Sequence, residues 1–229
     1  MRVKKKRLII SALVLFLLIL AVAAVILLWP KQKSKLYFGE AFEQQAWKLD
    51  AGWSVVQNDA GKKTVLAEGT DTTTSWNMEQ LLAENWCAST DIYLIGDSRD
   101  RGCARLVFGD DFGNVCVAVS VEYAGDSYVQ VLADVLLNRG GRLEKDGWRN
   151  VYATESWIAI ESEEPIRLSV SHVAGDQLLL ITLEQNDTVI LQDFSEKVHQ
   201  DILKLLKRTG LGVYDAHVGF SEFTVEEIG

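Results

Sequence analysis

The chain has 229 residues, a formal net charge of −9 and only three cysteines, Cys87, Cys103 and Cys116. This length allows one domain with a sizeable core, and the small, odd number of cysteines excludes a scaffold held by several disulfides. Eight of the 23 basic residues lie in the first 35 positions, so the rest of the chain holds 15 basic and 32 acidic residues. The resulting net charge of −17 disfavours nucleic acids and other polyanions as partners.

The N-terminal region predicts a membrane anchor. Residues 1–7 form a basic segment with five Arg or Lys side chains, and residues 8–29 run for 22 positions without a charge. A helix of that length reaches about 33 Å, enough to cross a hydrocarbon core of roughly 30 Å. We therefore expect a single-pass transmembrane signal anchor at 8–29, a juxtamembrane linker at 30–36 and one domain at 37–229.

A cleavable signal peptide is the alternative, because Ala21-Val22-Ala23 resembles a small-residue cleavage site. The apolar run continues past this site, which favours an uncleaved anchor. Five basic residues precede the run and three follow it closely, so the positive-inside rule predicts a cytoplasmic N-terminus. The C-terminal domain would then be extracytoplasmic.

Short apolar runs between turn-forming residues predict that the domain is β-structure almost throughout. Residues 102–108 and 115–121 alternate in polarity, and the Gly/Asp/Asn-rich residues between them predict a hairpin. If Phe108 pairs with Val115, Cys103 and Cys116 share a face but lie about 13 Å apart, too far for a disulfide. Further strands are predicted at 87–95, 128–132, 166–173, 177–183 and 188–191. Such regular short strands are typical of an antiparallel sandwich or barrel.

One helix is predicted near the C-terminus, at residues 195–208. Ser195 is a suitable N-cap, and Gly210 is suited to end the helix. The apolar stripe consists of Val198, Ile202, Leu205 and Leu206. We expect this stripe to pack on one end of the sandwich, and binding of a partner protein is the alternative.

The order of these signals resembles the concanavalin A-like lectin/glucanase superfamily. The matching segments are Phe42, Trp47 and 52–55 near the start, 102–114 in the middle, 166–170 and 175–176 later, and 210–225 at the end. The nearest types are laminin-G-like and 3-keto-disaccharide hydrolase-type domains, and the similarity covers residues 38–226. The resemblance implies a jelly roll of two curved antiparallel sheets, in which the opening strand pairs with the closing strand.

No catalytic residue is predicted. Glucanases of this superfamily hold carboxylates at alternate positions of one strand, so that two of them flank a glycosidic bond. The nearest carboxylate run here, Glu161-Ser162-Glu163-Glu164, precedes Pro165 and is typical of a solvated turn. Because no strand with alternating carboxylates is found, and because fold alone does not specify a reaction, an enzyme is the less favoured interpretation.

Trp76 and Trp148 are the predicted ligand contacts. Trp148 follows the loop-like stretch 145–147, and Trp76 lies in a polar run rich in Thr and Ser. An exposed indole offers a flat apolar face to a sugar ring. Packing in the core or at a sheet edge is the alternative for both residues.

Asp110, Asp111 and Asn114 are candidate ligands of a Ca²⁺ ion. Their oxygens suit calcium, and the resemblance implies that such an ion can lie at the rim of the sandwich. The same residue types are equally typical of a hairpin turn, so both interpretations stay open.

Together these observations predict a membrane-anchored, exported β-sandwich module that binds carbohydrate at the cell envelope. The alternatives are a protein–protein interaction module of an envelope complex and a glycoside-processing enzyme. The expected partners are the membrane, through the N-terminal helix, and a glycan or an envelope protein.

Overall fold

The computed structural model describes residues 47–49, 52–57, 63–69, 73–95, 102–111, 115–125, 127–137 and 148–228. The chain divides into two units, Met1–Ser34 and Lys35–Gly229, and every described residue belongs to the second unit. The predicted basic segment, anchor and linker lie outside the described residues. Within the described part of the chain, no helix is long and apolar enough to cross a membrane.

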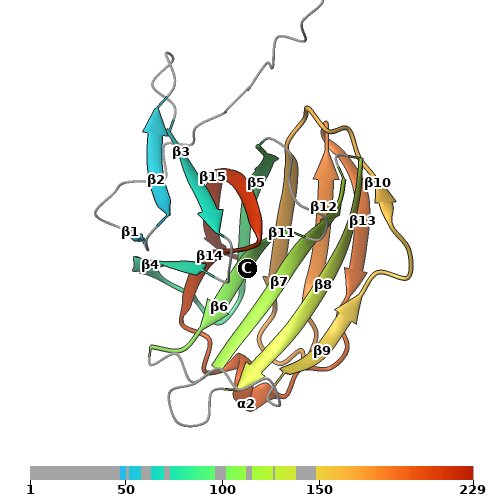
Figure 1. Cartoon of the computed structure of the whole chain (residues 1–229). Coiled ribbons are helices and arrows are strands. Elements are labelled where there is room, and N and C mark those ends of the chain that lie inside the picture. The colour runs from blue at the N-terminus through green and yellow to red at the C-terminus, as the bar shows by residue number, and fades with distance from the viewer. Residues whose placement is uncertain are drawn as a thin grey trace, which may run out of the picture. The chain divides into compact units, whose positions relative to one another are not determined.

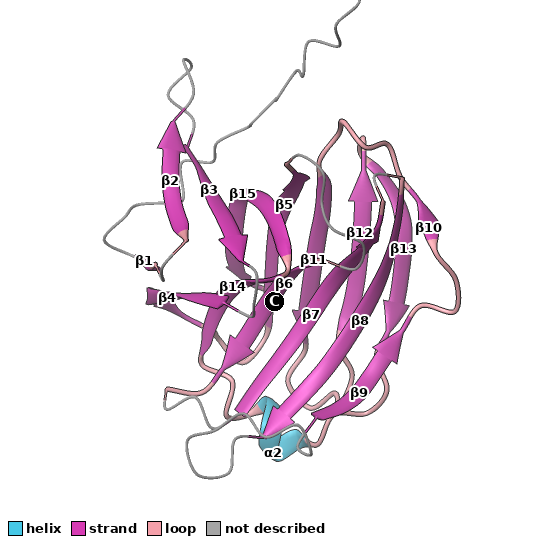
Figure 2. Cartoon of the chain, viewed as in Figure 1, coloured by secondary structure: helices cyan, strands magenta, loops and turns pink. Residues whose placement is uncertain are grey.

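The described residues form two antiparallel sheets (Figures 1 and 2). One sheet has the order β1 (Trp47–Lys48), β4 (Thr73–Leu81), β14 (Arg208–Tyr214), β6 (Cys103–Gly109), β7 (Val115–Ala124), β8 (Tyr128–Leu137) and β10 (Ile158–Ala159), and β9 (Trp148–Ala153) also pairs with β8. The other has the order β13 (Thr188–Phe194), β12 (Leu180–Gln185), β11 (Ile166–His172), β5 (Trp86–Leu94), β15 (Ala216–Glu227), β3 (Lys63–Gly69) and β2 (Trp53–Gln57). We call them the eight-stranded and seven-stranded sheets.

The two sheets pack face to face, as the predicted sandwich requires (Figure 1). In β7, the valines at 117, 119 and 121 are fully buried, and Leu106 of β6 and Leu168 of β11 are buried in the same core. Successive side chains of a strand point to opposite faces, so the apolar half of each alternating run fills the space between the sheets. The predicted all-β antiparallel sandwich is confirmed.

The predicted hairpin of β6 and β7 is present with a shifted register. Cys103 pairs with Glu122 and Gly109 with Cys116, rather than Phe108 with Val115. The turn lies one residue further along the chain than expected, and beside it the Asp110 N–H donates to the Val115 carbonyl at 3.3 Å. A shift of two residues keeps every side chain on its face, so the predicted alternation survives. All three cysteines are free thiols, and Cys103 and Cys116 are now about 20 Å apart along the sheet.

The C-terminal helix is much shorter than predicted. α2 spans Gln200–Leu203, its N-cap is His199, and it is the only helix among the described residues (Figure 2). Ser195 instead continues the sheet pairing, because its backbone N–H donates to the Leu179 carbonyl at 2.9 Å. Gly210 lies inside β14 and ends no helix.

The predicted apolar stripe is buried only in part. Val198 and Leu206 belong to the hydrophobic core and Ile202 packs against it, whereas Leu205 is 48% exposed. Leu203, which lies outside the predicted stripe, is also buried in the core. Most of the stripe therefore packs on the sandwich, and binding of a partner protein stays an alternative prediction.

The N-terminal strands differ from the arrangement implied by the resemblance. The opening strand β2 pairs with β3, and it is β3 that pairs with the closing strand β15. Trp47 and Trp53 are buried, in contact with Phe223 and Phe220 respectively. The ring centroids are 4.9 Å apart in the first pair and 5.9 Å apart in the second.

The alternating core predicts unequal costs for two leucine truncations on strands. Leu168 is 0% exposed and Leu81 is 58% exposed. Leu168→Ala should lower the free energy of unfolding by about 2–5 kcal/mol, because it leaves a cavity between the sheets. Leu81→Ala should change it by less than about 0.5 kcal/mol. Urea unfolding followed by circular dichroism measures both, and equal costs would contradict the assignment of the core.

Candidate functional site

Polar side chains gather on the outer face of the eight-stranded sheet. Arg105 of β6, Glu122 of β7 and Asp134 of β8 each lie next to a fully buried core residue. Alternation therefore directs their side chains away from the core. The register places Arg105 opposite Ser120, between the positions of Glu122 and Asp134. We call this surface the outer face.

A row of paired residues crosses the outer face from one side to the other. The row consists of Trp76, Gly210, Val107, Ala118, Asp134 and Asn150, each paired with the next. The middle members are small or apolar and nearly inaccessible, whereas an indole stands at one end and polar groups at the other. A row with small residues in the middle and larger aromatic or polar side chains at its ends suits a ligand that lies across the strands.

Arg105 has unused donors. Its Nε donates to the Cys103 Sγ at 3.1 Å, and its guanidinium carbon lies 5.7 Å from the centre of the Tyr214 ring. Among the described residues, none accepts a hydrogen bond from its terminal nitrogens. A guanidinium carries five N–H donors in a rigid fork, so most of its capacity is open to a ligand.

Two carboxylates flank Arg105, and each is held by an amide. Gln130 Nε2 donates to Glu122, and Asn150 Nδ2 donates to Asp134 Oδ1 at 3.1 Å. Each carboxylate keeps further lone pairs for other donors. Burial raises the pKa of Asp134, and the hydrogen bond from Asn150 and the charge of Arg105 oppose this shift.

The thiols on this face are poor nucleophiles. Burial raises the pKa of Cys103, although Arg105 acts in the opposite direction. Burial also raises the pKa of Cys116 to about 12. Because the reactive species is the thiolate, neither cysteine is suited to covalent chemistry at neutral pH.

The seven-stranded sheet provides a contrasting arginine. On the surface of this sheet that points away from the core, Arg167 Nη1 pairs with Asp91 Oδ1 at 2.9 Å, and Arg167 Nη2 donates to Ser89 Oγ at 2.8 Å. Ser89 in turn shares a hydrogen bond with Thr224 at 2.8 Å. This network satisfies its own members and serves to join β5, β11 and β15. We therefore place the candidate site on the outer face around Arg105.

The predicted ligand contact Trp76 lies at one end of the row on the outer face. It is half-buried and packs on glycines, since a Cβ on Gly109 would lie 2.8 Å from its ring and a Cβ on Gly210 would lie 3.0 Å from it. The absence of these two side chains lets the indole lie flat along the sheet. The indole is thus partly packed on the sheet, and its role as a ligand contact stays a prediction.

Trp148, the second predicted contact, belongs to the same sheet but lies on β9, far from β4 in the strand order. Its backbone pairs with Leu136 of β8, two residues from Asn150. The strands β14, β6, β7 and β8 separate it from β4, which carries Trp76. The two predicted contacts thus belong to one sheet, but four strands separate them.

The predicted calcium ligands are only partly described. The Asp110 side chain accepts from the Val115 N–H at 3.4 Å, and Asp111 pairs with Arg208 at 2.8 Å. Asn114 lies outside the described residues. No group of three or more acidic, His or Cys side chains suited to a metal occurs within the described ranges. The Asp110 contact is typical of a turn, Asp111 is held by an ion pair with a residue of β14, and calcium binding stays a prediction.

Sequence reasoning missed most of the site. The predicted alternation already separated the two faces of 102–108 and 115–121. It assigned no role to Arg105, Glu122, Asp134, Asn150 or Tyr214. The available signal was the polar half of each alternating strand. What was missing was the pairing of β6 with β14 and of β8 with β9, which brings these residues onto one surface.

The packing of Trp76 on Gly109 can be tested with a double-mutant cycle. Gly109→Ala should lower the free energy of unfolding by about 1–3 kcal/mol, because the new Cβ meets the indole. In a Trp76→Ala background the same change should cost clearly less, because only the Val115 carbonyl at 3.3 Å then crowds the new Cβ. Equal costs in both backgrounds, measured by urea unfolding, would show that the ring lies elsewhere.

Comparison with known proteins bears on the fold. No family model matches the sequence, and no curated protein matches it. Among solved structures, a carbohydrate-binding module CBM66 from Bacillus subtilis superposes with a TM-score of 0.53 at 16% identity, covering 80% of this chain and 96% of that one. A legume lectin-like domain from Entamoeba histolytica gives a TM-score of 0.55 at 11% identity, covering 85% and 97%.

A further match is the exoplasmic/lumenal domain of VIP36 in a form bound to Ca²⁺ and Man3GlcNAc. Its TM-score is 0.55 at 10% identity, covering 86% of this chain and 90% of that one. Likeness at such low identity concerns the arrangement of strands and not the side chains of a site. The chain has the concanavalin A-like jelly-roll fold that the sequence resemblance predicted.

Proposed function

We propose that the chain is a carbohydrate-binding module, held at the cell envelope by a membrane anchor at residues 8–29, and that it binds a glycan on the outer face. The observation that carries this proposal is the guanidinium of Arg105 at the centre of that face, whose terminal nitrogens meet no acceptor among the described residues. It lies beside an aromatic ring and between two amide-held carboxylates.

These groups match the chemistry of a sugar. The terminal nitrogens of Arg105 donate to hydroxyl oxygens, and the carboxylates of Glu122 and Asp134 accept from hydroxyl hydrogens. The faces of Trp76 and Tyr214 pack against the C–H faces of sugar rings. Tyr214 is 42% exposed and is therefore accessible to a ligand.

The charges on the outer face favour a neutral glycan. Glu122 and Asp134 outnumber Arg105 there, and the chain after residue 35 has a net charge of −17. An anionic polysaccharide would meet a repulsive potential on approach. A neutral chain of hydroxyl-bearing rings meets no such barrier.

The structural neighbours support the proposal, because they include a protein described as a carbohydrate-binding module and a domain bound to Man3GlcNAc. The VIP36 domain also holds Ca²⁺. We therefore retain a calcium ion near Asp110, Asp111 and Asn114 as part of the proposal, to be tested together with the glycan.

Glycoside hydrolysis is less well supported on this face. Glu122 and Asp134 lie on neighbouring strands and four residues apart in register, which separates their Cα atoms by about 14 Å. Paired catalytic carboxyl groups of glycosidases lie roughly 5–10 Å apart. These two carboxylates are better suited to holding hydroxyls at separate points along a ligand.

A glycan array tests the binding proposal. The full chain in lipid nanodiscs should bind a subset of neutral glycans, and the array should be run with and without Ca²⁺. Arg105→Gln should weaken that binding at least about tenfold, since a hydrogen bond from a charged group contributes roughly 1.5–3 kcal/mol. Arg149→Gln is the matched control, because Arg149 is an exposed cation elsewhere on the same sheet. A blank array, or equal binding by Arg105→Gln, would overturn the proposal.

The membrane anchor is tested by extraction. In cells, the chain should stay in the membrane fraction after washing with alkaline carbonate, because an uncleaved apolar helix is held by the hydrocarbon core. Deletion of residues 8–29 should move it to the supernatant. Release of the intact chain by carbonate, or an N-terminus at residue 24 by mass spectrometry, would contradict an uncleaved anchor.

A further inference from the structure

Two aromatic side chains stand exposed at one edge of the eight-stranded sheet. Tyr128 begins β8 and is 50% exposed, and Trp157 directly precedes β10 and is 44% exposed. The strands β8 and β10 pair along this edge, with Ile158 opposite Val129 (Figure 1). Continuing this register by one residue places Trp157 beside Gln130. The two aromatic residues are therefore diagonal neighbours across the strand pair, within reach of a common ligand.

Both aromatic side chains point to the outer face. Val129 of β8 is fully buried, so alternation directs the neighbouring Tyr128 away from the core. On the adjacent segment, Ile158 packs against the core, whereas Trp157 next to it is exposed. Tyr128 and Trp157 thus lie on the same surface as Arg105 and the carboxylates that flank it.

The groups between this aromatic pair and Arg105 are polar. Gln130 and Glu122 lie there, joined by a hydrogen bond from the Gln130 amide, and each keeps further hydrogen-bonding capacity. Single exposed apolar side chains are ordinary on a protein surface. Two aromatic faces next to such an amide and carboxylate are a different case. They match a sugar chain, in which every unit presents both C–H faces and hydroxyl groups.

The separation of these groups sets the length of the ligand. From Arg105 on β6, the way to Trp157 beside β10 crosses β7 and β8, and it also shifts by two residues along the strands. With about 4.8 Å between strands and about 3.3 Å between residues, the two Cα atoms lie about 16 Å apart. A pyranose unit of an extended chain is about as long as one strand spacing. A disaccharide is therefore too short to reach both residues.

We propose that Tyr128 and Trp157 form a second subsite of the glycan site, which holds sugar rings further along a chain whose first ring is bound at Arg105. The ligand is then a linear, neutral oligosaccharide of at least about four units, bound along its length rather than through one terminal sugar. This inference rests on the proposed function and deepens it, because it names the form and length of the glycan.

Ladders of β-1,4-linked glucose, xylose and mannose oligosaccharides, from two to six units, test the length of the site. Their binding to the full chain in lipid nanodiscs is measured by isothermal titration calorimetry. For at least one ladder, the affinity should rise about tenfold or more from the disaccharide to the hexasaccharide, because only the longer chain reaches the aromatic pair.

Variants assign this gain to the aromatic pair. Trp157→Ala and Tyr128→Ala should each lower the affinity for the hexasaccharide about fivefold, and that for the disaccharide less than about twofold. Trp157→Phe should keep most of the affinity, since it keeps an aromatic face. Phe194→Ala is the matched control, because it removes a similarly exposed aromatic side chain from β13 of the other sheet. It should change neither affinity.

The inference is overturned if no ladder shows tighter binding of the hexasaccharide than of the disaccharide, or if no hexasaccharide binds. It is also overturned if Trp157→Ala and Tyr128→Ala, both folded by circular dichroism, bind the hexasaccharide as tightly as the unchanged chain does. The proposed function is judged separately, by the glycan array and by Arg105→Gln, which should weaken the binding of both lengths. Binding that depends on Arg105 but not on chain length would contradict the second subsite alone.

Discussion

The period-two alternation of β6, β7 and β8 is the constraint on which the rest of the structure depends. Because Leu106, Val121 and Ala133 must enter the core, Arg105, Glu122 and Asp134 are directed to the opposite surface. The free energy of burying the apolar half fixes the register of the polar half, since a slip of one residue would exchange the two faces. The rigidity of the candidate binding face thus comes from the core behind it.

Two arginines show how the same residue type serves different purposes on the two sheets. Arg167 finds Asp91 and Ser89 within hydrogen-bonding distance and joins three strands. Arg105 finds a thiol and the face of a tyrosine ring, which are weaker partners than a carboxylate. Within the described residues the terminal nitrogens of Arg105 therefore keep donors that Arg167 has already used.

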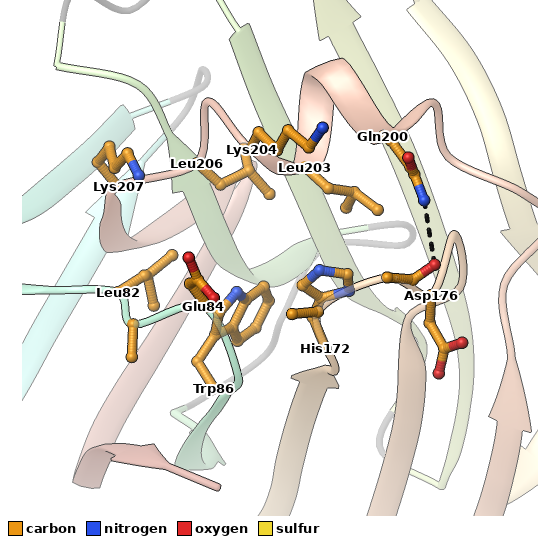
Figure 3. Close-up of a pocket in the computed structure, with 13 residues that line it drawn as sticks. Leu82, Glu84, Trp86, His172, Asp176, Gln200, Leu203, Lys204, Leu206 and Lys207 are labelled. Carbon is orange, nitrogen blue, oxygen red and sulfur yellow. Dashed lines mark hydrogen bonds between the residues drawn. The ribbon is translucent and has the colours of Figure 1, made fainter. Parts of the chain in front are cut away.

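The outer face and a pocket of about 610 Å³ beside α2 offer different environments (Figure 3). The outer face is polar, acidic overall and spread across several strands, as suits hydroxyl-rich chains. The pocket is partly open, and both apolar and charged side chains line it, among them Leu203, Lys204 and Glu84. Only the outer face follows from the alternation of strands, because the pocket forms where α2 and the segments next to it meet the end of the sandwich.

The sequence by itself determined the strands and their faces, because alternation is a local property that Val117, Val119 and Val121 already display. It also determined the hairpin of β6 and β7 and, through strand order, the jelly roll. Tertiary structure decided the rest. Ser195 pairs with Leu179 instead of capping a helix, since a sheet partner distant in sequence competes with the local cap. The neighbours of Arg105 and the glycines under Trp76 come from residues far apart in the chain. Their meeting depends on which strands pair, and that information is not local.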